Sequence, residues 1–296
     1  MPLVVNVEPV VDRLTLHIGD EPCYVDDCHV PWTLPSRDKA VPNDIETDDV
    51  LALFGRITVR AVDVVGATTE WGESGRRPGQ YLVDLAVDEV CVTPLLAAGF
   101  GVLSEESGMQ VPEGLPDGGA AGRSIVVVDP LDGSTNASLG LPWCATSLCL
   151  VVDGEPVVAM VTNLATGQRW TATRGSGSTL VGRSFSIGRS VGLADAMVAV
   201  SGLPDHHAGW RQFRAMGASA LDICSVASGT FDAFVDMSPD AHGVWDYIGA
   251  ALVVREAGGV VVDALGRELM VLDHAARRTP VAATSEALLT EVLAHR

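Results

Sequence analysis

The chain has 296 residues, 47% of them hydrophobic, which is enough to bury the core of one large domain or of two smaller ones. Its formal net charge is −19, from 38 acidic residues against 19 lysines and arginines. This balance argues against binding to nucleic acid, which requires basic side chains to neutralise phosphates, and against binding to an anionic membrane surface.

The N-terminus has neither a basic segment nor a clean apolar run, so no signal peptide is predicted. No long apolar run is free of charge, and the closest, Cys144–Val152, stops at Asp153. We therefore expect a cytoplasmic protein with reduced core cysteines. Cys23 and Cys28 could hold zinc, but an irregular loop is favoured there because no second ligand pair follows.

Residues 1–47 predict short strands, including one through Leu16 and Ile18, and then an irregular connector from Pro31 to Pro42. An apolar stripe next predicts a helix from Asp48 to about Trp71. A Gly- and Arg-rich loop, Glu73–Gln80, separates it from a second helical pattern, Leu82–Ala98. Asp84 and Asp88 would lie one turn apart on one face of that second helix.

A short strand is predicted at Phe100–Leu103, ending in Ser104-Glu105-Glu106-Ser107. After a Gly- and Pro-rich loop to Arg123, strands are predicted in Val126–Val128, 145–152, 156–163 and 169–173. The Gly- and Ser-rich stretch Thr173–Gly182 is predicted to be a seam between subdomains 48–183 and 184–296, with residues 1–47 as an N-terminal extension.

Strands and helices then alternate toward the C-terminus, which predicts a layered α/β architecture. The predicted strands are Ala196–Ser201, Ser219-Ala220, Ala233–Met237 and Val260–Asp263. The predicted helices are His206–Met216, Ile223–Gly229 and Asp246–Ala257.

The segment Asp129-Pro130-Leu131-Asp132-Gly133-Ser134-Thr135-Asn136 places two carboxylates three residues apart at the end of an apolar strand. Carboxylate and carbonyl oxygens suit Mg²⁺, and the turn that follows offers N–H groups and hydroxyls to an anion. An acidic protein that handles a phosphate ester also needs cations at the site, which fits bound metal. An ordinary acidic turn is the alternative for this segment alone.

Two more acids are candidate metal ligands. Glu105 closes a strand before a turn, as Asp129 does, and Asp246 opens the predicted helix Asp246–Ala257. A surface acid and a helix N-cap are the ordinary alternatives for these two residues. Trp245 and Val244 flank Asp246 with bulky apolar groups, which makes a merely solvated acid less natural.

Four segments resemble elements of the inositol monophosphatase family, which belongs to a superfamily of Mg²⁺-dependent, lithium-sensitive phosphatases. Asp129–Asn136 resembles its first signature, and Trp245-Asp246, with Glu256-Ala257-Gly258-Gly259 after it, is similar to its second. Ser104–Ser107 resembles its Gly-Glu-Glu-Ser element, and Gly217–Ala233 its substrate-side segment. The family implies an αβαβα layered sandwich, also described as α+β, like inositol monophosphatase and fructose-1,6-bisphosphatase, and a homodimer.

The resemblance also implies two or three Mg²⁺ ions held by oxygen donors. The first ion would be held by Glu105, Asp129 and the Leu131 carbonyl. The second would be held by Asp129, Asp132 and Asp246. Asp84, with Glu105, would serve a weaker third ion through water.

For catalysis, the resemblance implies that Ser134, where the family usually has threonine, orients the attacking water together with Glu105. The N–H groups of Gly133 and Ser134 would receive the phosphate. The other implied substrate contacts are Asp132, Thr135, Ser219, Ala220, Asp236 and Asp246. The expected mechanism is in-line attack by metal-activated water, because no Cys-x5-Arg or Asp-x-Asp nucleophile motif is present.

The chain departs from the family pattern in three places. The family's lysine upstream of the helical acid is missing, and the cations nearest Asp84 in sequence are Arg76 and Arg77. Ser238-Pro239-Asp240 is an insertion, and residues 1–47 have no counterpart.

The favoured substrate is myo-inositol 1-phosphate or a similar sugar phosphate. Fructose 1,6-bisphosphate, 3′-phosphoadenosine 5′-phosphate and histidinol phosphate stay open as alternatives within the family. A non-catalytic binding protein on the same scaffold is a further alternative, although such a protein has little reason to keep so many mutually repelling acids together.

Overall fold

The computed structural model describes residues 16–18, 21–23, 46–112, 124–188 and 190–296. The chain divides into two compact units, Met1–Pro35 and Ser36–Arg296. In the first unit, β1 (Leu16–Ile18) pairs antiparallel with β2 (Glu21–Cys23), which confirms the strand predicted through Leu16 and Ile18. The predicted connector and the possible zinc ligand Cys28 lie outside the described residues.

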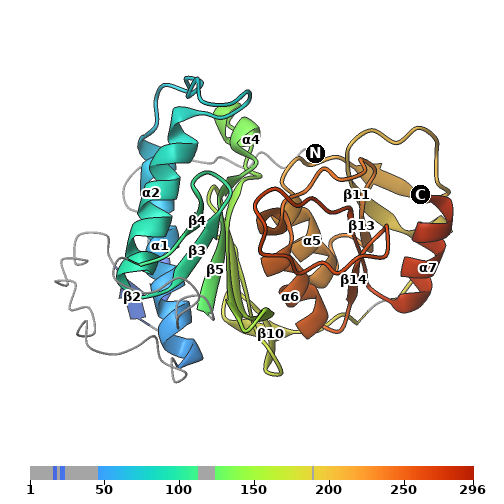
Figure 1. The fold of residues 1–296 in the computed structure, drawn as a ribbon. Coiled ribbons are helices and arrows are strands. Elements are labelled where there is room, and N and C mark those ends of the chain that lie inside the picture. The colour runs from blue at the N-terminus through green and yellow to red at the C-terminus, as the bar shows by residue number, and fades with distance from the viewer. Residues whose placement is uncertain (1–15, 19–20, 24–45, 113–123, 189) are drawn as a thin grey trace, which may run out of the picture. The chain divides into compact units, whose positions relative to one another are not determined.

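The described part of the second unit stacks helices and sheets in alternating layers (Figure 1). Helices α1 (Thr47–Ala67) and α2 (Leu82–Ala97) cover one face of a first sheet, and α5 (Ser219–Ala227) and α6 (Ile248–Glu256) lie between that sheet and a second one. Helix α7 (Glu286–His295) packs on the outer face of the second sheet. This order of layers confirms the predicted αβαβα architecture.

The first sheet has eight strands in the order β10-β9-β8-β7-β6-β5-β3-β4. All neighbours are antiparallel except β3 and β5. The strands are β3 Gly101–Ser104, β4 Gly108–Gln110, β5 Ser124–Asp132, β6 Ala145–Val152, β7 Glu155–Asn163, β8 Arg169–Thr173, β9 Gly177–Leu180 and β10 Arg183–Phe185. Every residue of β5 is buried because helices cover both faces of the sheet.

The second sheet has five strands in the order β12-β11-β13-β15-β14, in which β11 is parallel to both of its neighbours. The strands are β11 Met197–Ser201, β12 Gln212–Arg214, β13 Ala233–Asp236, β14 Val260–Asp263 and β15 Pro280–Ala283. No helix within the described ranges combines the length and the apolar character that crossing a bilayer needs.

Three clusters of apolar side chains fill the spaces between layers. One lies between α1, α2 and the first sheet and includes Phe54 and Leu95. A second surrounds α5 and α6 and includes Ile223 and Tyr247. The third lies between the second sheet and α7. The apolar stripes of α1 and α2 therefore face the first sheet, as their spacing predicts.

The predicted helix His206–Met216 is wrong. The chain is irregular there until β12, which pairs with β11. Gly209 has φ +94, which an α-helix does not allow, and the neighbouring Trp210 turns into the core of the second sheet. The predicted strand Ser219-Ala220 is also wrong, because these residues begin α5.

Two predicted boundaries shift. The first helix ends at Ala67 rather than near Trp71. The next residue, Thr68, takes an extended conformation, and its hydroxyl donates to the Val64 carbonyl. The stretch Thr173–Gly182 is not a seam, because it forms the hairpin between β8 and β9 inside the first sheet. The connection from the first sheet to the second leaves β10 after Phe185, and the division into two subdomains stays a prediction.

Candidate active site

The carboxylates of Asp129 and Asp132 reach one cavity because β5 is interrupted between them. Residues three apart on a regular strand face opposite sides of the sheet. Here Asp129 pairs with Ser147 and Asp132 with Ala145, so β5 carries one more residue than β6 in this interval. Pro130 lies in this bulge, where its missing N–H costs the sheet no hydrogen bond.

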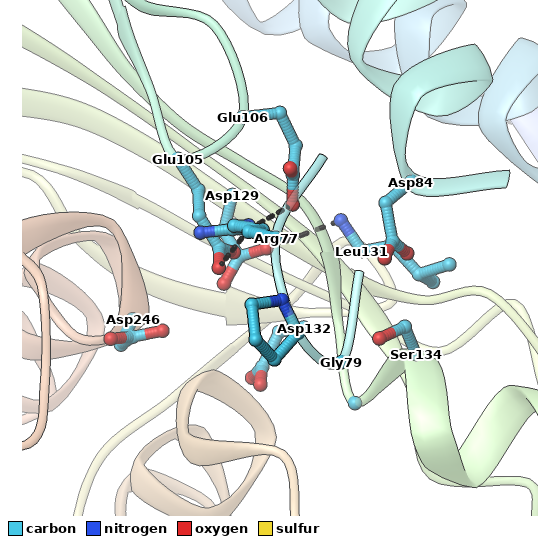
Figure 2. A pocket seen from close by; sticks show the side chains of 12 residues that line it. Arg77, Gly79, Asp84, Glu105, Glu106, Asp129, Leu131, Asp132, Ser134 and Asp246 are labelled. Carbon is cyan, nitrogen blue, oxygen red and sulfur yellow. Dashed lines mark hydrogen bonds and ion pairs between the residues drawn. The ribbon is translucent and has the colours of Figure 1, made fainter. Parts of the chain in front are cut away.

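The cavity has a volume of about 270 Å³, and its walls come from residues 77–134 and from Asp246, more than 100 residues later (Figure 2). Its lining residues are Arg77, Pro78, Gly79, Asp84, Glu105, Glu106, Asp129, Leu131, Asp132, Gly133, Ser134 and Asp246. Carboxylate oxygens of Glu105, Asp129 and Asp246 all lie within 4.8 Å of one another. Glu105 follows β3, Asp129 lies in β5, and Asp246 ends the 3-10 turn Val244–Asp246.

Asp132 joins the first sheet to helix α5. Its Oδ1 accepts the N–H of Ser219 at 3.2 Å, and its Oδ2 accepts the N–H of Ala220 at 2.7 Å. These N–H groups belong to the first turn of α5, where no helical partner exists for them. Each carboxylate oxygen can accept a second bond, so Asp132 can still face the cavity.

Burial and mutual repulsion make the ionised acids costly. Burial, followed by the charges of Glu105, Asp132 and Asp246, raises the pKa of Asp129 well above its usual range. Burial, with the charge of Asp246, does the same to the pKa of Asp132. Burial raises the pKa of Asp246 to about 7, opposed by His242. These carboxylates need a compensating positive charge to ionise together at neutral pH.

The residues present suit a divalent metal ion. The cavity is lined by carboxylates, whose oxygens are donors that Mg²⁺ prefers, and by Leu131, whose N–H donates to Asp129 Oδ1 at 3.1 Å. Two buried oxygens, Asp129 Oδ2 and Asp84 Oδ1, have no hydrogen-bond partner among the described residues. An unpartnered buried carboxylate oxygen is expensive, and a hard cation would satisfy both atoms.

Asp84 lies on the wall formed by α2. Its Oδ2 accepts the N–H of Tyr81 at 2.8 Å, and burial raises its pKa to about 7. Asp88 is buried on the same face, but its Oδ1 accepts the hydroxyl of Ser104 and it does not line the cavity. The prediction that both acids share one face is confirmed, and only Asp84 reaches the cavity.

Arg77 and Glu106 line the cavity although the sequence assigns them no role. Arg77 Nη2 lies 2.8 Å from Glu105 Oε1 and 2.6 Å from Glu106 Oε1 (Figure 2). The sequence signal for Arg77 was its place beside Arg76 as one of the cations nearest Asp84, where the family's lysine is missing. Its guanidinium partly offsets the charge of the two glutamates on this wall.

Among the predicted substrate contacts, Gly133 and Ser134 line the cavity, and Ser134 begins the short helix α4 (Ser134–Ser138). Thr135 is exposed and lies outside the lining. Ser219 and Ala220 touch Asp132 but do not line the cavity either.

The structure does not bring Asp236 to the cavity. Asp236 is fully buried, and its Oδ2 lies 2.8 Å from Nδ1 of His242 while its Oδ1 accepts the N–H of Ser238. His242 in turn lies 2.7 Å from the Ser219 hydroxyl. The three-residue insertion at Ser238 adds length to this loop, which is a physical reason for Asp236 to bond within it instead of facing a substrate.

Gly133 is required by both conformation and space. Its φ is +82, and an added Cβ would lie 2.9 Å from the Trp143 carbonyl oxygen and 3.0 Å from Ala218 Cβ. We expect Gly133→Ala to displace the Asp132–Ser134 turn and to lower phosphate release by at least about 10-fold, since small misplacements in a site are costly.

Gly154→Ala is the matched control, because Gly154 has φ +83 and open space around its Cβ position. The left-handed backbone should cost both variants about 1 kcal/mol of stability, measured by denaturant unfolding. Gly133→Ala should lose more, because its Cβ would lie 2.9 Å from the Trp143 carbonyl oxygen. Equal activity of the two variants would show that the space around Gly133 is not needed.

Comparisons with known proteins agree with this geometry. The model of the inositol monophosphatase family matches residues 82–296. An inositol-1-monophosphatase of Rhizobium meliloti is 37% identical over 182 residues, covering 56% of this chain and 64% of its own. A fructose-1,6-bisphosphatase/inositol-1-monophosphatase of Thermococcus kodakarensis is 30% identical over 262 residues, covering 83% of this chain and 91% of its own.

Among solved structures, the extragenic suppressor protein suhB from Bartonella henselae superimposes with a TM-score of 0.71 at 26% identity, covering 83% of this chain and 98% of its own. The chain spans a little under two thirds of the Rhizobium meliloti relative. The family match itself extends over both sheets and includes every acid that lines the cavity. This chain therefore belongs to the inositol monophosphatase family.

Proposed function

We propose that the chain is a Mg²⁺-dependent phosphomonoesterase that hydrolyses inositol monophosphate or a similar sugar phosphate. The observation that carries the proposal is the meeting of Glu105, Asp129 and Asp246 oxygens within 4.8 Å of one another, in a cavity that Ser134 also lines. The names of the Rhizobium meliloti and Thermococcus kodakarensis relatives support the choice of substrate class.

In this proposal the carboxylates divide the work of holding the cations. Glu105, Asp129 and the Leu131 carbonyl would hold one Mg²⁺, and Asp129, Asp132 and Asp246 a second. Asp84, whose Oδ1 is unpartnered among the described residues, would serve a weaker third. Bound cations would lower the pKa of water and neutralise charge on the phosphate.

The chain's own groups would then position the reactants. Glu105 and the Ser134 hydroxyl would orient the attacking water, and the bulge in β5 keeps Leu131 beside the same cavity. The N–H groups of Gly133 and Ser134 would receive the phosphate. Direct in-line attack by water requires no covalent phospho-enzyme.

A phosphate-release screen tests this proposal and separates the alternatives. The purified chain is incubated with Mg²⁺ and, in turn, myo-inositol 1-phosphate, fructose 1,6-bisphosphate, 3′-phosphoadenosine 5′-phosphate and histidinol phosphate. We expect the fastest release from myo-inositol 1-phosphate, and inhibition by Li⁺. Fast release only from one of the other three esters would move the chain to another branch of the family.

Release from none of the four esters would favour a non-catalytic binding protein and contradict the proposal. The proposal places the chain in the cytoplasm, as its N-terminal sequence and lack of a long apolar run predict. It also makes the chain a homodimer, as the family resemblance implies.

A further inference from the structure

Two of the clustered acids come from segments that the chain does not connect directly. Glu105 follows β3 of the first sheet, whereas Asp246 lies between β13 of the second sheet and α6. The long connection between β14 and β15, residues 264–279, reaches both places. His274, in that connection, contacts the main chain of Glu105 and the side chain of Trp245, which precedes Asp246.

The first contact of His274 is with the main chain of Glu105. Its Nε2 lies 2.9 Å from the Glu105 carbonyl oxygen. A carbonyl oxygen only accepts hydrogen bonds, so Nε2 carries the proton and donates it. This bond joins residues 169 apart in sequence and fixes the main chain from which the Glu105 carboxylate projects.

The second contact of His274 is with the indole of Trp245. The two ring centroids lie 4.8 Å apart with 32° between the ring planes, and Trp245 is only 3% exposed. Arg277 covers the same indole, with its Cζ 5.2 Å from the ring centroid, and donates from Nη1 to the His274 carbonyl at 2.8 Å. The indole is therefore held by two side chains of one turn.

The position of the indole is coupled to the Asp246 carboxylate through Gly243. An added Cβ on Gly243 would lie 2.3 Å from a Trp245 ring atom, so the indole packs directly on the Gly243 backbone. The N–H of Gly243 donates to Asp246 Oδ2 at 2.7 Å. A displacement of the indole would therefore shift Gly243 and the carboxylate bonded to it.

We propose that His274 is a positioning residue that sets the separation of Glu105 and Asp246 and thereby the metal affinity of the cavity. The inference rests on the metal site of the proposed function. Residues that orient metal ligands typically contribute about 10- to 100-fold in affinity when they are lost. His274 lies outside the four segments of this chain that resemble elements of the family.

Mn²⁺ titration of the full chain, followed by the electron paramagnetic resonance signal of free Mn²⁺, tests the inference without any substrate. We expect H274F and H274L, which lack a donor, to bind Mn²⁺ about 10-fold more weakly than the wild type. H274Q, whose side-chain amide can reach the Glu105 carbonyl, should stay within about 3-fold of the wild type. In assays, the donor-free variants should need more Mg²⁺ but approach the wild-type kcat at saturation.

His207→Leu is a matched control, because His207 also contacts a tryptophan, with its ring centroid 5.8 Å from that of Trp210, and does not line the cavity. This variant should keep the wild-type affinity for Mn²⁺. If one donor-free variant does not fold, as judged by circular dichroism, the other carries the comparison. Failure of both to fold would overturn the inference, because His274 would then serve the fold rather than the metal site.

Wild-type affinity in H274F or H274L, or an H274Q variant as weak as H274L, would overturn the role of His274 alone. No Mn²⁺ binding by the wild type would overturn the metal site and with it the proposed function.

Discussion

Asp129→Asn should reduce the rate of phosphate release by at least about 10³-fold, corresponding to a loss of about 4 kcal/mol of transition-state stabilisation. Asp129 is fully buried at the centre of the cluster, and its unpartnered Oδ2 is the atom that a cation would engage. An amide keeps the size of the carboxylate but offers one neutral oxygen. The measurement is kcat with the best ester of the screen at saturating Mg²⁺.

The same substitution should stabilise the protein when metal is absent. Burial and the charges of Glu105, Asp132 and Asp246 oppose ionisation of Asp129, so its removal relieves repulsion in the folded state. In the presence of EDTA, the melting temperature of Asp129→Asn should exceed that of the wild type. A gain in stability together with a loss of activity is the signature of an acid retained for function rather than for folding.

Asp153→Asn is the control for both measurements. Asp153 is an exposed residue with φ +51, a conformation that asparagine adopts readily. It should keep wild-type activity and stability. Equal activity of the Asp129 and Asp153 variants would refute the assignment of the cavity as the active site.

Mg²⁺ should raise the melting temperature, and the increase should be larger at alkaline than at acidic pH. A ligand at about 100 times its dissociation constant stabilises the folded state by about 2.7 kcal/mol, which is about 5 °C for a unit of this size. Metal binding requires ionised carboxylates, and those of Asp84 and Asp246 have a pKa of about 7 without metal. Below that pH, protons compete with the cation.

The metal-free protein should show the opposite trend. The pKa of Asp84 and Asp246 is raised to about 7 in the folded state, from an ordinary value of 3.8. The unfolded chain therefore holds fewer protons between about pH 4 and pH 7, and stability without metal should fall as the pH rises through this window. Melting curves with EDTA and with Mg²⁺ across this range give both trends.

The two curves should therefore diverge as the pH rises. A Mg²⁺-induced shift that does not depend on pH would mean that the raised pKa values belong to groups that the cation does not touch. No shift at any pH would contradict metal binding itself.

The elements that sequence alone predicts well are those whose signal is local. The apolar stripes of α1 and α2 and the unbroken apolar run of β5 depend only on neighbours in the chain, and the structure confirms all three. The acids of the site lie at the ends of such elements: Glu105 follows β3, Asp129 and Asp132 close β5, and Asp246 precedes α6. Glu105, Asp129, Asp132 and Asp246 all line the cavity.

The elements that sequence misplaces depend on distant partners. Helix α5 begins at Ser219, where the Asp132 carboxylate, 87 residues earlier, accepts the Ser219 N–H. Strand β12 exists because it pairs with β11, and Trp210 beside it is drawn into the core of the second sheet. Local propensity does not depend on either contact, so the sequence predicts a strand where α5 begins and a helix where β12 lies.

The contacts of Arg77, His242 and His274 also depend on partners far away in the sequence. Arg77 bonds to Glu105 and Glu106 across 28 and 29 residues, and His274 reaches Glu105 across 169. A single basic or aromatic side chain in a loop carries no periodic signal. Such residues are found only when coordinates show what they touch.

The most direct test of the account is a crystal structure of the chain grown or soaked with Mn²⁺, with the ions located by anomalous scattering. We expect at least one ion bound by carboxylate oxygens of Glu105, Asp129 and Asp246, at the distances of about 2.0–2.3 Å that hard divalent cations adopt. Crystals that take up Mn²⁺ elsewhere while leaving these three side chains without an ion would contradict it.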